Sequence, residues 1–467
     1  QLLPRGGAWV AAALFAVHPV HVEAVGNVVG QAELWSGAAL IGAVGLYLRA
    51  RRGGVPLDRQ TGIIIGGLYF GGMMFKENAI VLPALLMGAE ALVVTDERPW
   101  RVRVDELARL VVWLGLLAAL FLAVRVLVTG EIGGDVEHGA LRNLGAGERA
   151  WVMLGLAPEL ARLLIWPARL YADYSPQQVQ VHPSPHPDHA SGALLLLCIV
   201  VLAIVSVRRF PLVSFAIVWS AITYLPVANL LIPTGILIAE RTLFLPSVGA
   251  VLAAGSLVPW CLPRIAGLRR EWRLVMAGAF AVVLTAGFAR SAARQYAWKD
   301  STTVFKTLAT DAPLSFKAHY ANGGMLWEAG RAAEGEREWR IAIAIFPGYH
   351  GVYQELAHRY REGHFCPAAI PLYHKALAIE PELPMARIGL AACHLEIAEF
   401  RKARTEARVA IADGFYRRAF EYIIAKADSA LIATDSLDGA NRWKPVKSTT
   451  PLTPARPAAA RTAGKTR

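Results

Sequence analysis

The sequence predicts an all-α membrane protein, a polytopic transmembrane helical bundle followed by an α-solenoid of helical repeats. Of its 467 residues, 55% are hydrophobic and only 18% are charged, and the mean hydropathy is +0.39. This is too apolar for a soluble protein of this size and predicts the bundle. Pro313, Pro347 and Pro381 recur every 34 residues (347 − 313 = 34 and 381 − 347 = 34), a period typical of stacked helix pairs.

Apolar stretches recur from the start of the chain to residue 289. They lie at 7–17, 32–48, 61–75, 79–95, 107–128, 191–207, 211–232, 242–262 and 273–289. A bilayer core about 30 Å thick is crossed by roughly 20 apolar residues in a helix. We therefore predict an integral, multi-pass membrane domain over residues 1–296. Because the chain starts at Gln1 with a short first stretch, we expect earlier helices upstream.

Arginine clusters follow every second stretch and predict the topology. They are Arg49, Arg51 and Arg52; Arg98, Arg101 and Arg103; Arg208 and Arg209; and Arg264, Arg269, Arg270 and Arg273. The positive-inside rule makes these clusters cytoplasmic. Loops 18–31, 76–78, 129–190 and 233–241, together with everything after the last stretch, then lie on the opposite side. This requires residues 151–170 to lie at the interface or re-enter rather than cross.

The net charge of +12 comes mainly from residues beside the membrane stretches and in the tail, so we expect no nucleic acid partner. On the predicted outer side, charges gather in four groups. They are Glu23 and Glu33 within HPVHVEAVGNVVGQAELWSG (18–37), Lys76 and Glu77, Asp173, and Glu240 and Arg241. Charges at membrane depth usually serve a substrate or an ion, which favours one shared cavity. The alternative is that each is an ordinary loop charge.

Residues 297–432 carry the 34-residue period of tetratricopeptide repeats. The middle unit places Tyr353, Leu356, Ala357, Tyr360, Ala369, Tyr373, Ala376 and Pro381 at its bulky, small and terminating positions. The small residues let two antiparallel helices approach closely, and the proline ends the second helix. Stacked units leave a concave surface suited to an extended peptide, so Tyr353 and Tyr360 are candidate contacts for an acceptor.

The soluble part also contains two cysteines and a C-terminal tail of biased composition. Cys366 and Cys393 could pair outside the cytoplasm, but two separate thiols are an equal alternative. Residues 433–467 are rich in Pro, Thr, Ala and basic residues and are predicted to be a disordered basic tail.

Three parts of the chain together resemble the transmembrane and tetratricopeptide-repeat-containing O-mannosyltransferase family, polytopic glycosyltransferases of the GT-C fold. The segment 15–25, followed by Gly30-Gln31-Ala32-Glu33, is similar to the signature loop of the family. Residues 229–249 resemble its second signature, and Lys76-Glu77 and Asp173-Tyr174-Ser175 match two shorter motifs. With the repeats, the resemblance covers about residues 8 to 415.

The resemblance implies transfer of a mannose-like hexose from a polyprenyl-phosphate donor in the membrane to a protein hydroxyl on the outer face. The implied donor-binding residues are Glu23, Gln31, Glu33, Lys76, Glu77, Glu240 and Arg241. Arg241 and Lys76 are expected near the lipid phosphate, and the two carboxylates of residues 23 and 33 at the sugar or a divalent metal. His18 and His21 could bind that metal, but helix-capping or packing roles are the alternative. Asp173 could face the acceptor or be structural.

Two departures from the family pattern limit these expectations. Gln31 replaces the arginine of the usual Gly-Arg-Ala-Asp, while Glu33 keeps a carboxylate one methylene longer. The catalytic base is expected upstream of Gln1, so the chain alone is expected to be inactive. A membrane-anchored repeat scaffold with a degenerate GT-C domain is the alternative function, and a transporter is a third. The basic, alanine-rich composition favours a bacterial inner membrane with periplasmic repeats.

Overall fold

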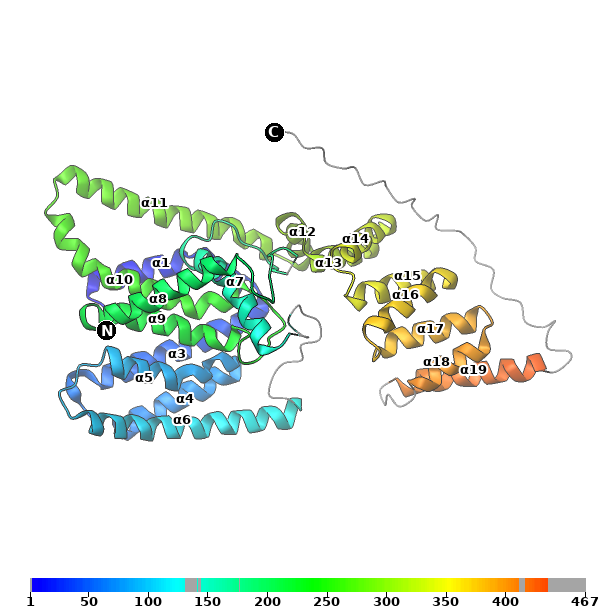
Figure 1. Ribbon diagram of the computed structural model, residues 1–467, viewed down its shortest axis with the longest axis horizontal. Helices are drawn as coiled ribbons and strands as arrows, with labels where there is room; N and C mark the ends of the chain where they lie inside the picture. The colour runs from blue at the N-terminus through cyan, green and yellow to red at the C-terminus, as the bar shows by residue number, and fades with distance from the viewer. Residues whose placement is uncertain (1, 131–140, 142–143, 176, 411–415, 436–467) are drawn as a thin grey trace. The chain divides into compact units, whose positions relative to one another are not determined.

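A computed structural model describes residues 2–130, 141, 144–175, 177–410 and 416–435 (Figure 1). Within these ranges every regular element is an α- or 3-10 helix, as the sequence predicted. The chain divides into two compact units, Gln1–Met325 and Leu326–Arg467. The composition boundary predicted at residue 296 precedes this division, so residues 297–325 belong to the first unit. Most of the predicted tail, 436–467, lies outside the described residues.

The first unit is a bundle of helices. Its helices are α1 (Arg5–Val17), α2 (Val22–Gly26), α3 (Gln31–Ala50), α4 (Arg59–Phe75), α5 (Leu82–Leu92), α6 (Trp100–Thr129), α7 (Ala146–Ile165), α8 (His189–Arg209), α9 (Pro211–Tyr224), α10 (Phe244–Ala266), α11 (Arg270–Gln295) and α12 (Ser301–Asp311). Long connections join α7 to α8 and α9 to α10. Helices α3 and α4 pack side by side, as do α9 and α10, and α1 lies against α10. The core between α3, α4 and α5 is filled by side chains such as Tyr47, Tyr69 and Leu85.

Five helices of the described part are long and apolar enough to cross a membrane. They are Val28–Ala50, Trp100–Thr129, His189–Arg209, Glu240–Ala266 and Arg270–Trp298, and a sixth span results if Arg5–Val17 and the bent continuation Pro19–Gly26 count as one. The chain is therefore an integral membrane protein. Helix α7, which the topology requires not to cross, does not meet this standard, and neither do α4, α5 and α9, which the topology requires to cross.

Large apolar side chains cover the outside of α6, α8 and α11. Leu127, Val205 and Val282 are all exposed, and the apolar window of α11 has no buried residue. Exposed apolar surface of this extent is unstable in water and marks a surface that another apolar phase covers. Lipid contact accounts for these three helices.

Some predicted stretches are shorter helices in the structure. The stretch 211–232 leaves the α-helix at Leu225, which begins the 3-10 turn Leu225–Val227. Asn229 then adopts a positive φ of 56°, which asparagine tolerates better than most residues. Its side chain holds the following loop by accepting from the Thr234 amide at 2.8 Å and donating to the Ile236 carbonyl at 2.9 Å. The loop therefore ends the helix before the predicted stretch does.

A buried ion-pair network closes one end of the bundle. Arg51, which is 3% exposed, follows α3 and donates to Glu90 and to Asp96, each at 2.8 Å. It also donates to Glu106 at 3.3 Å, and Arg103 binds Glu90 at 2.8 Å. The network thus joins the ends of α3 and α5 to the start of α6, and its members come from two of the predicted cytoplasmic clusters.

Helix α3 separates this network from charged residues at its other end, among them Glu33. Glu33 stands at the start of α3 and Arg51 just after its end, a separation of 18 residues (51 − 33 = 18). At a rise of 1.5 Å per residue this is about 27 Å, close to the thickness of a bilayer hydrocarbon core. Along α3 the two groups are therefore about one hydrocarbon-core thickness apart, while the arginine-based topology stays a prediction.

Helix pairs recur at a constant interval through the repeat region, which begins in the first unit and continues in the second. They are α13 (Phe316–Glu328), α14 (Ala332–Ile345), α15 (His350–Glu362), α16 (Cys366–Ile379), α17 (Pro384–Glu396) and α18 (Phe400–Val409), followed by α19 (Arg417–Asp435). First helices start at 316, 350 and 384 (350 − 316 = 34 and 384 − 350 = 34). The 34-residue period read from the prolines is therefore a period of helix pairs.

Cys366 and Cys393 form a disulfide between α16 and α17, with Cα atoms 5.1 Å apart, which resolves an alternative that the sequence left open. The bond closes a loop with a sequence separation of 27, and loops of this length gain roughly 3–4 kcal/mol from cross-linking.

We expect reduction, or the Cys366→Ser/Cys393→Ser variant, to lower the unfolding temperature of the second unit. Thermal unfolding of the purified chain with and without reductant measures this. An unchanged temperature, with four free thiols titrated in the unfolded, untreated protein instead of only Cys198 and Cys261, would contradict it.

Candidate functional site

Glu23 and Arg241 form the centre of a charged group at the end of the bundle opposite the Arg51 network. Glu23 lies in the short helix α2 and is 1% exposed. Its carboxylate accepts a hydrogen bond from the Arg241 amide at 3.0 Å and pairs with the Arg241 guanidinium. Arg241 lies in the 3-10 turn Glu240–Leu243 that opens α10. The two signature segments, 218 residues apart, therefore meet through this pair.

Glu33 forms a second paired carboxylate nearby. It is 2% exposed, lies 3.7 Å from Lys76 Nζ, and accepts a hydrogen bond from Asn78 Nδ2 at 3.3 Å. Arg241 also acts electrostatically on Glu33, which connects the two carboxylate–cation pairs. The Lys76 side chain keeps 30% exposure, so this cation can meet a ligand.

Glu240 is fully buried beside the first pair. Its Oε1 accepts a hydrogen bond from the Tyr174 hydroxyl at 3.0 Å and lies 3.7 Å from Arg294 Nη2. Its Oε2 is buried and accepts no hydrogen bond from the described residues. Burial, together with the neighbouring carboxylate of Glu240, raises the pKa of Tyr174 far above its usual value. The tyrosine is therefore a hydrogen-bond donor at any physiological pH.

Gly30 allows the signature loop to fold back on itself. A Cβ at this position would lie 2.7 Å from the Glu23 carbonyl oxygen and 2.8 Å from the Ala24 Cα. Backbone atoms cannot move away cheaply, so only glycine permits this approach. The close contact fixes the start of α3, and with it Glu33, relative to Glu23.

His18 and His21 are held by protein groups. His18 Nε2 bonds to the Leu164 carbonyl at 3.0 Å, and its Nδ1 accepts from the Val20 amide at 3.3 Å. His21 is buried and bonds through Nε2 to Ser247 Oγ at 2.8 Å. Both ring nitrogens of His18 thus have protein partners, which is the capping and packing role the sequence offered as the alternative. The metal role of the pair stays a prediction.

Three other predicted site residues lie at the margin of this group. Gln31 is exposed at the first position of α3. Glu77 is 50% exposed on its side chain and lies 3.9 Å from Arg125. Asp173 accepts a hydrogen bond from Ser315 at 2.6 Å, and Ser315 in turn caps α13. A structural role is thus visible for Asp173, while the acceptor role stays a prediction.

Tyr353 and Tyr360, the predicted acceptor contacts, line a groove of about 620 Å³ in the second unit. The groove runs between α14, α15 and α16, and its charged members include Arg340 and Lys375. Tyr360 donates to Glu336 at 2.7 Å. Burial and this carboxylate raise the pKa of Tyr360 to about 12. The groove is therefore apolar and aromatic with charges at its edges.

Sequence reasoning missed several members of the charged group. Asn78 was visible because it directly follows Lys76-Glu77, but nothing local linked it to Glu33. Tyr174 was noted as part of a motif without a partner. Arg294, at the end of α11, carried no signal beyond being a basic residue near a membrane stretch. Each of these residues gains its role only from contact with a carboxylate far away in the chain.

Curated relatives support a family assignment, although no family model matches the chain. The chain is 24% identical over 456 residues, 89% of its length and 48% of the relative, to protein O-mannosyl-transferase TMTC3 of Mus musculus. It is 23% identical over 345 residues, 73% of its length and 46% of the relative, to protein O-mannosyl-transferase F38B6.6 of Caenorhabditis elegans. It is also 25% identical over 386 residues to protein O-mannosyl-transferase Tmtc3 of Drosophila melanogaster, covering 73% of its own length and 40% of that protein.

The chain spans less than half the length of each of these relatives. The matches nevertheless cover most of this chain, and they come from nematode, insect and mammal. Over most of its length the chain is therefore similar to the TMTC-type protein O-mannosyl-transferases.

Proposed function

We propose that this chain is part of a membrane glycosyltransferase that moves a mannose-like hexose from a polyprenyl-phosphate donor to a protein hydroxyl. The observation that carries the proposal is the pairing of Glu23 with Arg241 at the end of the bundle, with Glu33 and Lys76 beside them. Buried carboxylates held by cations are costly in a membrane protein and are usually retained for function. The names of the relatives supply the reaction class.

The proposed chemistry divides the charged group into two roles. Arg241 and Lys76 stabilise the phosphate of the donor, whose negative charge grows as the bond to the anomeric carbon breaks. A guanidinium carries five N–H donors, so Arg241 can hold Glu23 and still donate to a phosphate oxygen. Glu23 and Glu33 then orient sugar hydroxyls. A base outside this group deprotonates the acceptor hydroxyl, which attacks the anomeric carbon and inverts it.

The groove around Tyr353 and Tyr360 is the proposed acceptor site. Its volume of about 620 Å³ is that of a ligand pocket, and aromatic side chains with flanking charges suit an extended peptide. The disulfide between Cys366 and Cys393 favours an oxidising compartment. This supports a topology with the repeats on the extracytoplasmic side, which in a bacterium is the periplasmic side of the inner membrane.

The reaction is tested with membranes that contain the full-length protein carrying this chain. We expect transfer of labelled hexose from a polyprenyl-phosphate hexose to protein, and a loss of about 10²-fold in Glu33→Gln. Lys76 is partly exposed and stays hydrated in this variant, so Glu33→Gln leaves no unpaired charge buried. Glu271→Gln is the matched control and should transfer normally, because Glu271 is an exposed residue in the first turn of α11 that pairs with Arg269.

Gln31 provides the observation that favours a second candidate, a membrane-anchored repeat scaffold. It replaces a cation of the family motif, and a degenerate donor site would follow from this loss. No transfer above background by the full-length protein, with intact binding of peptides by the repeats, would favour the scaffold. Equal transfer by the native protein and Glu33→Gln would instead refute the assignment of the site.

A further inference from the structure

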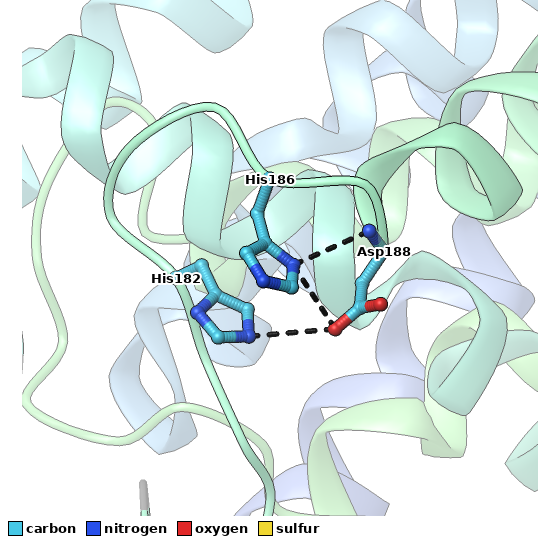
Figure 2. A group of neighbouring side chains, drawn as sticks. All are labelled: His182, His186 and Asp188. Atoms are coloured by element: carbon cyan, nitrogen blue, oxygen red, sulfur yellow. Dashed lines mark hydrogen bonds and ion pairs between the residues drawn. The ribbon is translucent and has the colours of Figure 1, made fainter.

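Two histidines and an aspartate meet just before and at the start of α8, apart from the charged group described above (Figure 2). His182 Nε2 lies 3.4 Å and His186 Nδ1 lies 3.1 Å from Asp188 Oδ2. One nitrogen or oxygen atom from each residue lies within 4.8 Å of the others. All three side chains are partly exposed, so the cluster is accessible from solvent.

The backbone around these residues is unusually rigid for a loop. Pro183, Pro185 and Pro187 alternate with the polar residues, and each proline fixes its own φ. The His189 amide donates to the His186 carbonyl, and the Ala190 amide donates to the Pro187 carbonyl, each at 3.0 Å. A loop with few accessible conformations loses little entropy when its side chains bind a ligand. The segment is therefore preorganised.

Hydrogen bonding shows which atoms face one another. His186 Nδ1 lies 3.3 Å from the Asp188 amide nitrogen and 3.1 Å from Asp188 Oδ2, so it either accepts from the amide or donates to the carboxylate. A metal ion on Nδ1 would replace the amide hydrogen bond, because the unprotonated ring nitrogen has one lone pair. The rings of His182 and His186 are stacked with centroids 3.7 Å apart. Protonation of both rings would therefore place two like charges in contact.

We propose that His182, His186 and Asp188 form a binding site for a divalent transition metal, with Zn²⁺ as the best fit. Ligand atoms around a tetrahedral zinc ion with bonds of about 2.0–2.1 Å lie about 3.3 Å apart, and the two distances to Asp188 match this spacing. Because a metal binds in the plane of an imidazole, the two stacked rings turn apart when the ion binds. Two imidazoles and a carboxylate suit zinc, whereas magnesium and calcium prefer oxygen alone. Solvent supplies the fourth ligand.

His189 supports the site without belonging to it. It is buried, its Nδ1 accepts from the His186 amide at 3.0 Å, and its ring stacks on Trp151 of α7 with centroids 5.2 Å apart. These contacts hold the second histidine of the site on α7 and α8. A bound ion would fasten His182, and the loop before it, to the same two helices.

Zinc binding by the purified chain tests the proposal. The protein carries an affinity tag without histidine, is stripped with chelator, and is titrated with ZnCl₂ by calorimetry. We expect one saturable equivalent, and Co²⁺ in its place should give the visible absorption of tetrahedral cobalt. His186→Ala and Asp188→Asn should weaken binding by about 10- to 100-fold, since loss of a ligand costs at least as much as loss of an outer partner.

Two control variants separate this site from other histidines. His358→Ala removes half of an exposed His–Glu pair, 3.3 Å from Glu362, and should leave the equivalent in place. Unfolding temperatures of the metal-free variants should match the native protein, because the ligands are at the surface. Unaltered affinity in His186→Ala and Asp188→Asn would overturn the proposal. So would loss of the equivalent in His21→Ala with retention in His186→Ala, which would locate the metal elsewhere.

Discussion

Removing the Arg241 guanidinium is expected to reduce hexose transfer by about 10²- to 10³-fold, the usual effect of losing one charge-stabilising donor. A simple Arg241→Ala variant would be ambiguous, because it leaves the buried Glu23 carboxylate with only the Arg241 amide as a partner. Breaking a buried pair in this way costs about 3–5 kcal/mol. Misfolding could then imitate a loss of catalysis.

The informative comparison is therefore Glu23→Gln against Glu23→Gln/Arg241→Ala. Both variants lack the buried carboxylate, and they differ only in the guanidinium. We expect lower transfer and weaker product inhibition by polyprenyl phosphate in the double variant, because Arg241 contacts the phosphate in the proposed site. Similar unfolding temperatures would show that the comparison is sound. Equal transfer and equal inhibition in the two variants would mean that Arg241 is only the counter-ion of Glu23.

Arg51→Ala is expected to cause the largest loss of stability, about 3–5 kcal/mol. Arg51 contacts Glu90, Asp96 and Glu106, and its removal leaves two of these carboxylates buried with fewer cations. Arg103 still pairs with Glu90 at 2.8 Å, so the loss stays below complete unfolding. Arg51→Lys should restore only part of the stability, because an ammonium cannot reproduce the planar fork that joins several carboxylates.

Thermal unfolding of the detergent-solubilised protein, followed by tryptophan fluorescence and size exclusion, measures this effect. Arg269→Ala is the matched control, because Arg269 pairs with Glu271 on an exposed turn at the same predicted side of the membrane. Exposed ion pairs contribute about 0–1 kcal/mol, so this control should unfold with the native protein. An Arg51→Ala variant that unfolds with the control would show that the network is not needed for stability.

The charged group shows how far sequence patterns reach. The carboxylates and cations were recognisable because each stands among apolar residues. A charged side chain at membrane depth is energetically costly and is usually functional. Their pairing was not recognisable. Glu23 could have met Lys76 or Arg241, and Glu33 either of the same cations. The close approach permitted by Gly30 and the turn before α10 decide the pairing, and neither is encoded in spacing along the chain.

Local properties of the sequence determined the α-helical class, the membrane-spanning stretches and the 34-residue repeat, because hydropathy and helix period act over tens of residues. Only the tertiary structure decided that Cys366 pairs with Cys393, that Arg241 meets Glu23 across 218 residues, and that Arg51 gathers three carboxylates. These contacts depend on how helices pack against one another. Packing is set by the shape of whole helix faces, so a short segment carries no record of its distant partner.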